Sequence, residues 1–239
     1  MSRVSIYTNQ LSIGYGQHVV QRALSFELFS GELVCMLGTN GCGKSTLLQT
    51  LSGLILPLSG SFKSEEPAVV LTERTSLENT TVHDVVALGR YPYTDYLGTL
   101  KQEDERLIDE SLMAVGMTEV ERWKNGFFNA LSDGEKQRVL IAKALAQATP
   151  VILLDEPTAH LDLPNRILVL KLLRELAHEQ DKTILLSTHE LDLALQMSDR
   201  ILLMTPEKGI ELDTAENLKQ KGAFQKAFKM NIFEPLQSN

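Results

Sequence analysis

Short runs of consecutive apolar residues recur along the chain and predict buried strands. Runs of this length, bounded by turn residues, are consistent with strands that a parallel sheet covers on both faces. In such a sheet the carboxyl ends of the strands gather at one edge, so the residues that follow the runs should lie close together. The runs cover residues 33–37, 68–71, 150–154 and 183–187.

Alternating polar and apolar residues mark a second kind of strand. Residues 4–14 and 19–30 alternate around the turn at Gly14, Tyr15 and Gly16, which predicts a small antiparallel sheet. Residues 201–204 and 209–212 predict a closing hairpin. Residues 61–66 are polar and predict a tight connection, after which the strand at 68–71 should lie beside the loop at 38–46.

Apolar residues spaced three and four positions apart predict helices between these strands. The predicted helices cover residues 44–53, 81–89, 102–115, a long helix that opens near residue 132, residues 164–178 and short helices through Met230. Three tyrosines, Tyr91, Tyr93 and Tyr96, follow the second helix. Tyrosine-rich loops favour contacts with a partner, although the rings could also pack on their own subdomain.

Composition and charge argue against several classes of protein. The 239 residues contain 23 Lys and Arg against 31 Asp and Glu, a net charge of −8, which argues against a broad nucleic-acid-binding surface. The two cysteines, Cys35 and Cys42, form no disulfide framework and suit a reducing compartment. We expect no signal peptide and no membrane span, because no apolar stretch is long enough.

The most specific motif lies where the first apolar run meets a helix. Residues 38–46 match the phosphate-binding pattern G-x-x-x-x-G-K-[ST] at a strand-to-helix turn. Its backbone N–H groups and the helix N-terminus attract phosphate, Lys44 would reach the β- and γ-phosphates, and Ser45 would bind Mg²⁺. A glycine-rich turn with a solvated lysine is the alternative. The loop consists of Gly38, Thr39, Asn40, Gly41, Cys42, Gly43, Lys44, Ser45 and Thr46.

Two adjacent carboxylates follow the apolar run at 150–154. In a parallel sheet they would lie beside the phosphate loop. Asp155 would then hold Mg²⁺, directly or through water, and Glu156 could polarise a water for attack on the γ-phosphate. A helix or turn cap is the other interpretation of adjacent acids after a strand.

Three further positions each have a plain structural interpretation. Ser132 with Asp133 and Glu135 suits the start of a helix, so capping alone explains these residue types. His189 follows the strand at 183–187, where a histidine is more often structural than catalytic. Tyr15 could stack on adenine or sit half-buried at a sheet edge. Their combination carries more information than any one of them.

The ordered set of motifs resembles the nucleotide-binding subunit of an ATP-binding-cassette (ABC) transporter over most of the chain. It comprises Tyr15, residues 38–46, 131–135, 151–156 and 159–162, and His189. Residues 81–92 are similar to the ATPases of importers for iron-siderophores, haem and cobalamin. The resemblance implies an α/β fold with a P-loop NTPase core and a mainly parallel sheet, an antiparallel β edge subdomain and a helical insertion. The core would span about 1–72 and 150–239, and the helical subdomain about 76–149.

The resemblance also implies a homodimer that sandwiches two ATP molecules with Mg²⁺. Each phosphate loop would face Ser132, Gly134 and Glu135 of the second copy, while Asp162 helps link the two sites. Tyr15 would stack on adenine, Glu156 would be the general base and His189 would contact the γ-phosphate. A transmembrane permease would dock near residues 73–97 and hold the chain at the cytoplasmic face of the membrane. A substrate-binding protein would act indirectly, and nucleic acid is not an expected partner.

The chain departs from the family pattern at two places. Asp133 and Glu135 stand where the signature has glycine and glutamine, and both add negative charge near a bound polyphosphate. Glu73 aligns with a glutamine that senses Mg²⁺ and the lytic water, and its carboxylate could serve as a metal ligand. Three alternatives stay open: a cassette for a divalent metal or an exported compound, a soluble cassette ATPase without a permease, and a regulatory module that holds ATP without hydrolysing it.

Overall fold

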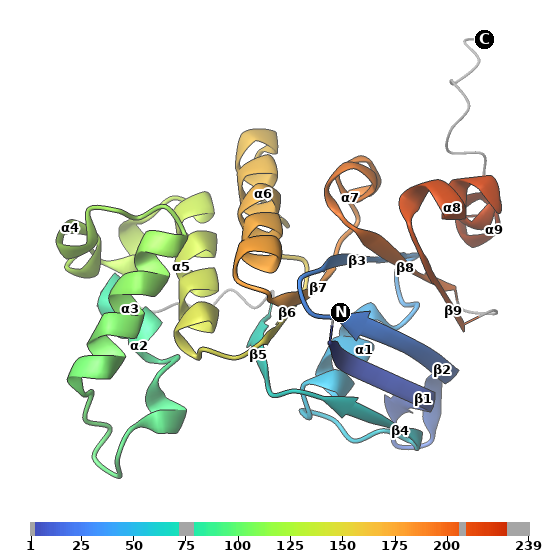
Figure 1. Cartoon of the computed structure of the whole chain (residues 1–239), viewed down its shortest axis with the longest axis horizontal. Helices are drawn as coiled ribbons and strands as arrows, with labels where there is room; N and C mark the ends of the chain where they lie inside the picture. Colours follow the sequence, from blue (N-terminus) through green and yellow to red (C-terminus); the bar gives the residue numbers. More distant parts are fainter. Residues whose placement is uncertain (1–2, 72–78, 206–208, 229–239) are drawn as a thin grey trace.

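The computed structural model describes residues 3–71, 79–205 and 209–228. A six-stranded sheet runs through its centre (Figure 1) in the order β5-β6-β7-β3-β8-β9. All neighbouring strands in it are parallel except β9, which is antiparallel to β8. The strands are β3 (Leu33–Gly38), β5 (Pro67–Val70), β6 (Val151–Leu154), β7 (Thr183–Ser187), β8 (Arg200–Thr205) and β9 (Gly209–Asp213). The apolar runs and the closing hairpin therefore form the strands that the sequence predicts.

The place of β5 in this sheet differs from the expectation. Strand β5 pairs only with β6, so it lies at the edge, whereas β7 and β8 flank β3 and its loop. The expectation that the strand at 68–71 lies beside the phosphate loop is wrong. Chain order does not set sheet order in a fold with crossovers, because later strands can insert between earlier ones.

A second, three-stranded antiparallel sheet has the order β2-β1-β4. Strands β1 (Val4–Tyr15) and β2 (His18–Phe29) are the predicted pair, whereas β4 (Ser59–Ser64) includes residues expected to be a connection. None of the six residues of β4 is buried. The strand therefore has no buried apolar face, and its sequence lacks the apolar pattern from which a strand could be predicted. Pairing with β1 places Gly60 at a bulge, where a Cβ atom would lie 2.1 Å from the carbonyl oxygen of Gln10.

Helices cover both faces of the parallel strands. Along β3, alternate residues join two different apolar clusters, one facing α1 and the antiparallel sheet, the other facing α6 and the C-terminal helices. Burial on both sides explains why this strand is apolar throughout. These helices are α1 (Lys44–Leu51), α6 (Leu163–Glu179), α7 (Leu191–Met197), α8 (Ala215–Gln220) and α9 (Ala223–Phe228).

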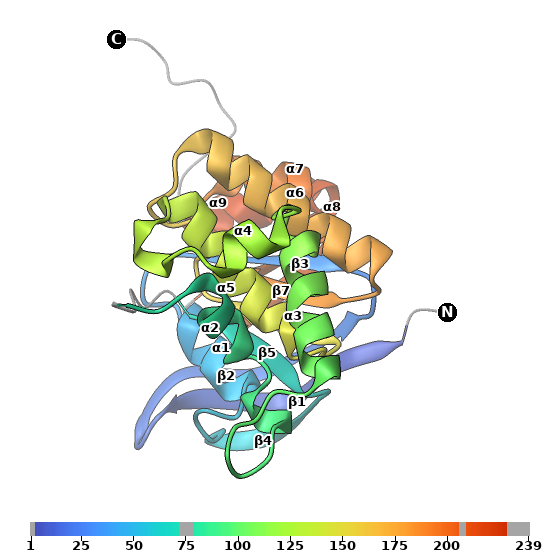
Figure 2. The same ribbon diagram turned by 90° about the vertical axis from the view of Figure 1, so that its left-hand side faces the viewer.

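Four further helices gather on one side of the sheet, in green and yellow-green in Figure 1. Seen from that side, α3 and α5 pack against each other (Figure 2). Arg90 connects the segment after α2 to α3 and α5. Its Nε donates to Asp104 at 2.8 Å and its NH1 donates to the carbonyl oxygen of Ala146 at 2.7 Å. The helices are α2 (Val82–Ala87), α3 (Gln102–Ala114), α4 (Val120–Lys124) and α5 (Asp133–Ala146).

The C-terminal helices and the expected absence of a membrane span can be compared with the described residues only. The short C-terminal helices are confirmed up to Phe228, and Met230 lies outside the described residues, as does Glu73. Among the helices of the described ranges, none combines the length and apolar character that a membrane crossing needs.

Candidate nucleotide-binding site

The phosphate loop forms a tight turn between β3 and α1. Gly43 has φ of +105°, a left-handed conformation that residues with a side chain rarely adopt. A Cβ atom there would lie 2.7 Å from Val20 Cγ1, and one on Gly38 would lie 2.5 Å from the carbonyl oxygen of Met204. Glycine at both positions therefore lets the backbone curl against its neighbours, which is the shape that directs N–H groups toward phosphate.

Lys44 lies within this turn and is only 7% exposed. Its Nζ donates to the carbonyl oxygen of Gly38 at 3.0 Å, so the ammonium group spans the loop from its end back to its first residue. Thr39, Asn40 and Ser45 are exposed on the same loop. The cation and the open hydroxyl groups thus lie where a polyphosphate would meet the helix N-terminus.

Gln21 of β2 supports the loop from the antiparallel sheet, a contact that the sequence patterns did not predict. Its Nε2 donates to the carbonyl oxygens of Cys42 and Thr205, both at 2.9 Å. The only sequence signal is a polar residue at an inward position of an alternating strand. Cys42 itself is a free, buried thiol, and burial raises its pKa, as it raises the pKa of Cys35 to about 12.

Asp155 and Glu156 follow β6, at the same edge of the sheet as the phosphate loop. The backbone N–H of Asp155 donates to the carbonyl oxygen of Val70 at 2.9 Å, which extends the pairing of β6 with β5 by one residue. Glu156 then turns away with φ of +48°, an uncommon conformation for a residue with a side chain. Both acidic side chains belong to partly exposed residues, so they can meet a ligand from solvent.

The end of β7 connects these two acids. The Oγ of Ser187 donates to Asp155 Oδ1 at 2.6 Å and accepts a hydrogen bond from the backbone N–H of Glu156 at 2.9 Å. His189 pairs through Nε2 with Glu156 Oε1. The order β6-β7-β3 therefore brings the acids, the histidine and the phosphate loop together. The sequence patterns predicted His189 here but missed Ser187, which looked like an ordinary strand residue.

The remaining predicted residues form a second group. Ser132 caps α5, and its backbone N–H and hydroxyl both donate to Glu135 Oε2, at 2.8 and 2.7 Å. These hydrogen bonds lower the pKa of Glu135. Asp162 caps α6 by accepting from the backbone N–H of Asn165 at 3.0 Å. A Cβ atom on Gly134 would lie 2.5 Å from Asn165 Oδ1, so the starts of α5 and α6 are in close contact.

This second group does not join the first within one chain. Figure 1 shows α5 and α1 on opposite sides of β6 and β7. Ser132, Asp133 and Asp162 are exposed, so a ligand or another chain can reach them. In this chain α5 therefore lies apart from α1, the helix that follows the phosphate loop.

Tyr15 lies at the end of β1, where its ring is half exposed. Its hydroxyl donates to Gln49 Oε1 of α1 at 2.8 Å, which holds the ring beside the helix that follows the phosphate loop. The residue is 50% exposed, so both interpretations from the sequence fit this position. The ring can be an edge residue and still offer one face to a base.

The donor set near the loop fits Mg²⁺ that arrives with a nucleotide. Within the described ranges, no three His, Cys, Asp or Glu residues converge as a metal-binding group. Mg²⁺ commonly keeps several waters and uses one or two protein oxygens together with substrate phosphates. The hydroxyl of Ser45 and the carboxylate of Asp155 are oxygen donors of that kind. Glu73, the third predicted ligand, lies outside the described residues.

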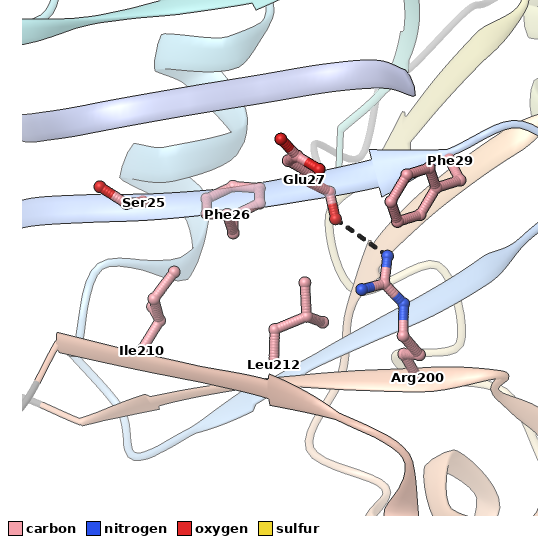
Figure 3. A pocket seen from close by; sticks show the side chains of 7 residues that line it. All are labelled: Ser25, Phe26, Glu27, Phe29, Arg200, Ile210 and Leu212. Carbon is pink, nitrogen blue, oxygen red and sulfur yellow. Dashed lines mark hydrogen bonds between the residues drawn. The ribbon is translucent and has the colours of Figure 1, made fainter. Parts of the chain in front are cut away.

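A hollow of about 360 Å³ lies elsewhere, between β2 and the β8–β9 hairpin (Figure 3). Arg200 on its wall donates to the carbonyl oxygen of Glu27 at 2.9 Å and pairs with Glu32. None of the predicted site residues borders this hollow, and it is separate from the nucleotide-binding candidate. It is lined by Ser25, Phe26, Glu27, Phe29, Arg200, Ile210 and Leu212.

Known proteins share both the sequence and the fold. The sequence profile of the ABC transporter family matches residues 21–159. An uncharacterized ABC transporter ATP-binding protein of Methanocaldococcus jannaschii is 41% identical over 228 residues, which cover 90% of this chain and 78% of that protein. The iron(3+)-hydroxamate import ATP-binding protein of Bacillus subtilis is 34% identical over 241 residues, which cover 95% of this chain and 88% of that protein.

Solved structures agree with these relatives. An inward-facing transporter assigned to the metal-chelate type has a TM-score of 0.87 at 29% identity, and the match covers 95% of this chain and 90% of that chain. A dimeric ATP-binding cassette in a post-hydrolysis state, bound to ADP and Pi, has a TM-score of 0.72 at 25% identity, covering 88% of this chain and 98% of that one. The chain, with its phosphate loop beside the strand-end acids, therefore belongs to the ABC transporter family as an ATPase subunit.

Proposed function

We propose that this ATPase is the energy-coupling subunit of an importer for iron-siderophores, haem or cobalamin. The observation that carries the ATP-dependent part is the meeting of the phosphate loop, the two acids and His189 at the carboxyl ends of β3, β6 and β7. The likeness to an iron(3+)-hydroxamate import protein and to a metal-chelate type transporter supports the substrate class.

Within one subunit, each residue of the site has a distinct task. Lys44 binds the β- and γ-phosphates after exchanging its hydrogen bond with Gly38 for phosphate oxygens. Ser45 and Asp155 would hold Mg²⁺, and the bound ion would supply positive charge that offsets the charge developing on the phosphates. Glu156 takes a proton from the attacking water, and His189, its partner in the structure, contacts the γ-phosphate.

A second copy of the chain would complete each site. At the N-terminus of α5, Ser132 is exposed, Glu135 is partly exposed and Gly134 is buried, and α5 lies across β6 and β7 from α1 of its own chain. Donors and a helix dipole at such a terminus suit the γ-phosphate of a nucleotide held by another subunit. The dimeric cassette with ADP and Pi supports this arrangement, in which Asp162 lies near the contact.

The permease would dock on the helical side of the molecule. Tyr91, Tyr93 and Tyr96 are 55%, 42% and 98% exposed in the loop after α2, so they are free to contact a partner. The guanidinium of Arg90 lies 4.3 Å from the Tyr93 ring centroid and connects this loop to the buried pair with Asp104. A displacement of the tyrosines by a bound partner would therefore be transmitted through Arg90 to α3 and α5.

The domain division and location follow from this proposal. The core comprises about residues 1–72 and 150–239, and the helical subdomain about 76–149, all in one ATPase domain. The permease holds the chain at the cytoplasmic face of the membrane, and a substrate-binding protein delivers the cargo to the permease.

Three measurements test the proposal. The purified chain should hydrolyse ATP only with Mg²⁺ present, and a regulatory module would bind ATP without turnover. A tagged chain extracted from membranes should co-purify with a polytopic permease, and reconstituted vesicles should take up a ferric siderophore, haem or cobalamin in an ATP-dependent manner. Uptake of a simple divalent ion instead would overturn the substrate class alone.

A further inference from the structure

We propose that Ser187 is a positioning residue for hydrolysis, because one buried hydroxyl fixes both the acid that would bind Mg²⁺ and the backbone of the residue that would supply the general base. This inference rests on the proposed roles of Asp155 and Glu156. It adds a residue that touches neither nucleotide nor metal and acts through its two neighbours.

The hydroxyl of Ser187 uses its donor and its acceptor capacity on two consecutive residues. It donates to Asp155 Oδ1 at 2.6 Å and accepts from the backbone N–H of Glu156 at 2.9 Å. Ser187 itself is fully buried, so its hydroxyl is not accessible to bulk water, although its two partners are partly exposed. Both contacts cross from β7 to the residues that follow β6, and they fix the direction of the Asp155 carboxylate as well as the local backbone.

The backbone at Glu156 needs such support. Strand β6 ends at Leu154, and Glu156 has φ of +48°, which is uncommon for a residue with a side chain. Its N–H no longer belongs to the ladder between β6 and β7 and finds its partner in Ser187 instead. Without the hydroxyl, this part-buried N–H would lose that hydrogen bond and the turn would be less well determined.

The same strand end holds the Glu156 side chain as well. His189, two residues after Ser187, pairs with Glu156 Oε1. Ser187 also pairs in register with Met36 of β3, two residues before the phosphate loop begins. Strand β7 therefore lies between the acids and the loop, and the hydroxyl acts on the acidic side only, so its removal should leave nucleotide binding by the loop intact.

A matched control separates positioning from a general effect of a buried hydroxyl. Thr183 begins the same strand, is also fully buried, and donates from Oγ1 to the carbonyl oxygen of Phe29 at 3.0 Å. It lies at the opposite end of β7 from the acids. Thr183→Val thus removes a comparable hydrogen bond from the strand without touching Asp155 or Glu156.

The experiment compares Ser187→Ala, Ser187→Thr and Thr183→Val with the wild type in steady-state ATP hydrolysis over a range of Mg²⁺ concentrations. For Ser187→Ala we expect kcat to fall about tenfold and the Mg²⁺ concentration at half-maximal activity to rise several-fold, with KM for ATP changed less than about twofold. Ser187→Thr keeps the hydroxyl and should restore most of the activity. Thr183→Val should lower thermal stability but leave the Mg²⁺ dependence unchanged.

A second readout does not depend on turnover. In the Glu156→Gln background, Mn²⁺ affinity is measured by electron paramagnetic resonance in the presence of ATP, and binding of a fluorescent ATP analogue is measured in EDTA. Adding Ser187→Ala should weaken Mn²⁺ binding about tenfold and leave analogue binding without metal unchanged. Should Ser187→Ala not fold, Ser187→Cys, which keeps the side-chain volume with a weaker donor, should lower kcat and Mn²⁺ affinity in the same direction and leave analogue binding without metal unchanged.

A wild-type Mg²⁺ dependence and kcat in a folded Ser187→Ala or Ser187→Cys variant would overturn the inference. A change of equal size in Thr183→Val would do the same, since the effect would then belong to the strand as a whole. A wild-type chain that hydrolyses no ATP would instead overturn the proposed function, so the two failures can be told apart.

Discussion

Two regions of the molecule carry the proposed ATP chemistry, and they are built differently. The strand-end cluster, which consists of Lys44, Asp155, Glu156, Ser187 and His189, lies at or just after the carboxyl ends of strands that are buried throughout, with Lys44 at the start of α1. Its members are tied to one another or to the phosphate loop. The cap of α5, formed by Ser132 and Glu135, is exposed and bonded to itself.

This difference between the two regions predicts that ATP binding and ATP hydrolysis have different requirements. A rigid sheet can hold phosphate-binding groups in place before the nucleotide arrives, so one chain should bind ATP. The α5 helix lies on the other side of β6 and β7 from α1 (Figure 1), so in the proposed dimer its cap would serve the nucleotide of the other chain. Hydrolysis should therefore require two chains, while binding should require one.

The largest effect is expected from Glu156→Gln in the strand-end cluster. The amide keeps the size of the side chain but cannot accept a proton, so turnover should fall by a factor of about 100 or more while ATP still binds. Hydrolysis and binding of a fluorescent nucleotide are measured on the same preparation. Near-normal hydrolysis would remove Glu156 from the role of general base.

The cap of α5 is tested by Ser132→Ala, for which we expect hydrolysis to fall about tenfold. Binding of ATP by a single chain should not change, because Ser132 lies apart from the phosphate loop. Thr81→Ala is the matched control, since Thr81 caps α2 with a capping box of the same kind. Both variants should lose about 1 kcal/mol of stability. Equal loss of hydrolysis in the two variants would show that only helix stability matters.

Substitutions of Tyr15 test whether the site also contacts the adenine base of the nucleotide. If the ring stacks on adenine, Tyr15→Ala should weaken ATP binding roughly fivefold or more. Tyr15→Phe loses only the hydrogen bond to Gln49 and should bind normally. Titration with ATP and with inorganic triphosphate separates base from phosphate contacts. A ring that serves only as a sheet-edge residue would leave both affinities unchanged in both variants.

The smallest expected effect is a pH dependence at the cap of α5. Hydrogen bonds from Ser132 lower the pKa of Glu135 below its ordinary value of 4.5, so the ionised carboxylate stabilises the folded state at neutral pH. This stabilisation is lost as the pH falls below 4.5 through the lowered pKa of the folded state. The difference in melting temperature between wild type and Glu135→Gln should therefore shrink between pH 7 and acid pH. A constant difference would contradict the contribution of ionised Glu135.

Much of the site could be predicted because its signals are local. The phosphate loop depends on glycines, a lysine and a strand-to-helix turn within nine consecutive residues, and the acids follow an apolar run directly. The contributions of Ser187 and Gln21 could not be predicted, because a polar residue in a strand has no distinctive local pattern. The partners of Ser187 are 32 and 31 residues away in the chain, and those of Gln21 are 21 and 184 residues away.

The sequence by itself determined the main strands and helices, the phosphate loop, the acids after β6 and the histidine after β7. These depend on residue type and spacing over short distances, where sterics and burial act on neighbouring residues. Only the tertiary structure decided that β5 lies at the sheet edge, that polar β4 pairs with β1, and that α5 starts away from the loop. Those outcomes depend on contacts between residues far apart in the chain, whose energies no short segment contains.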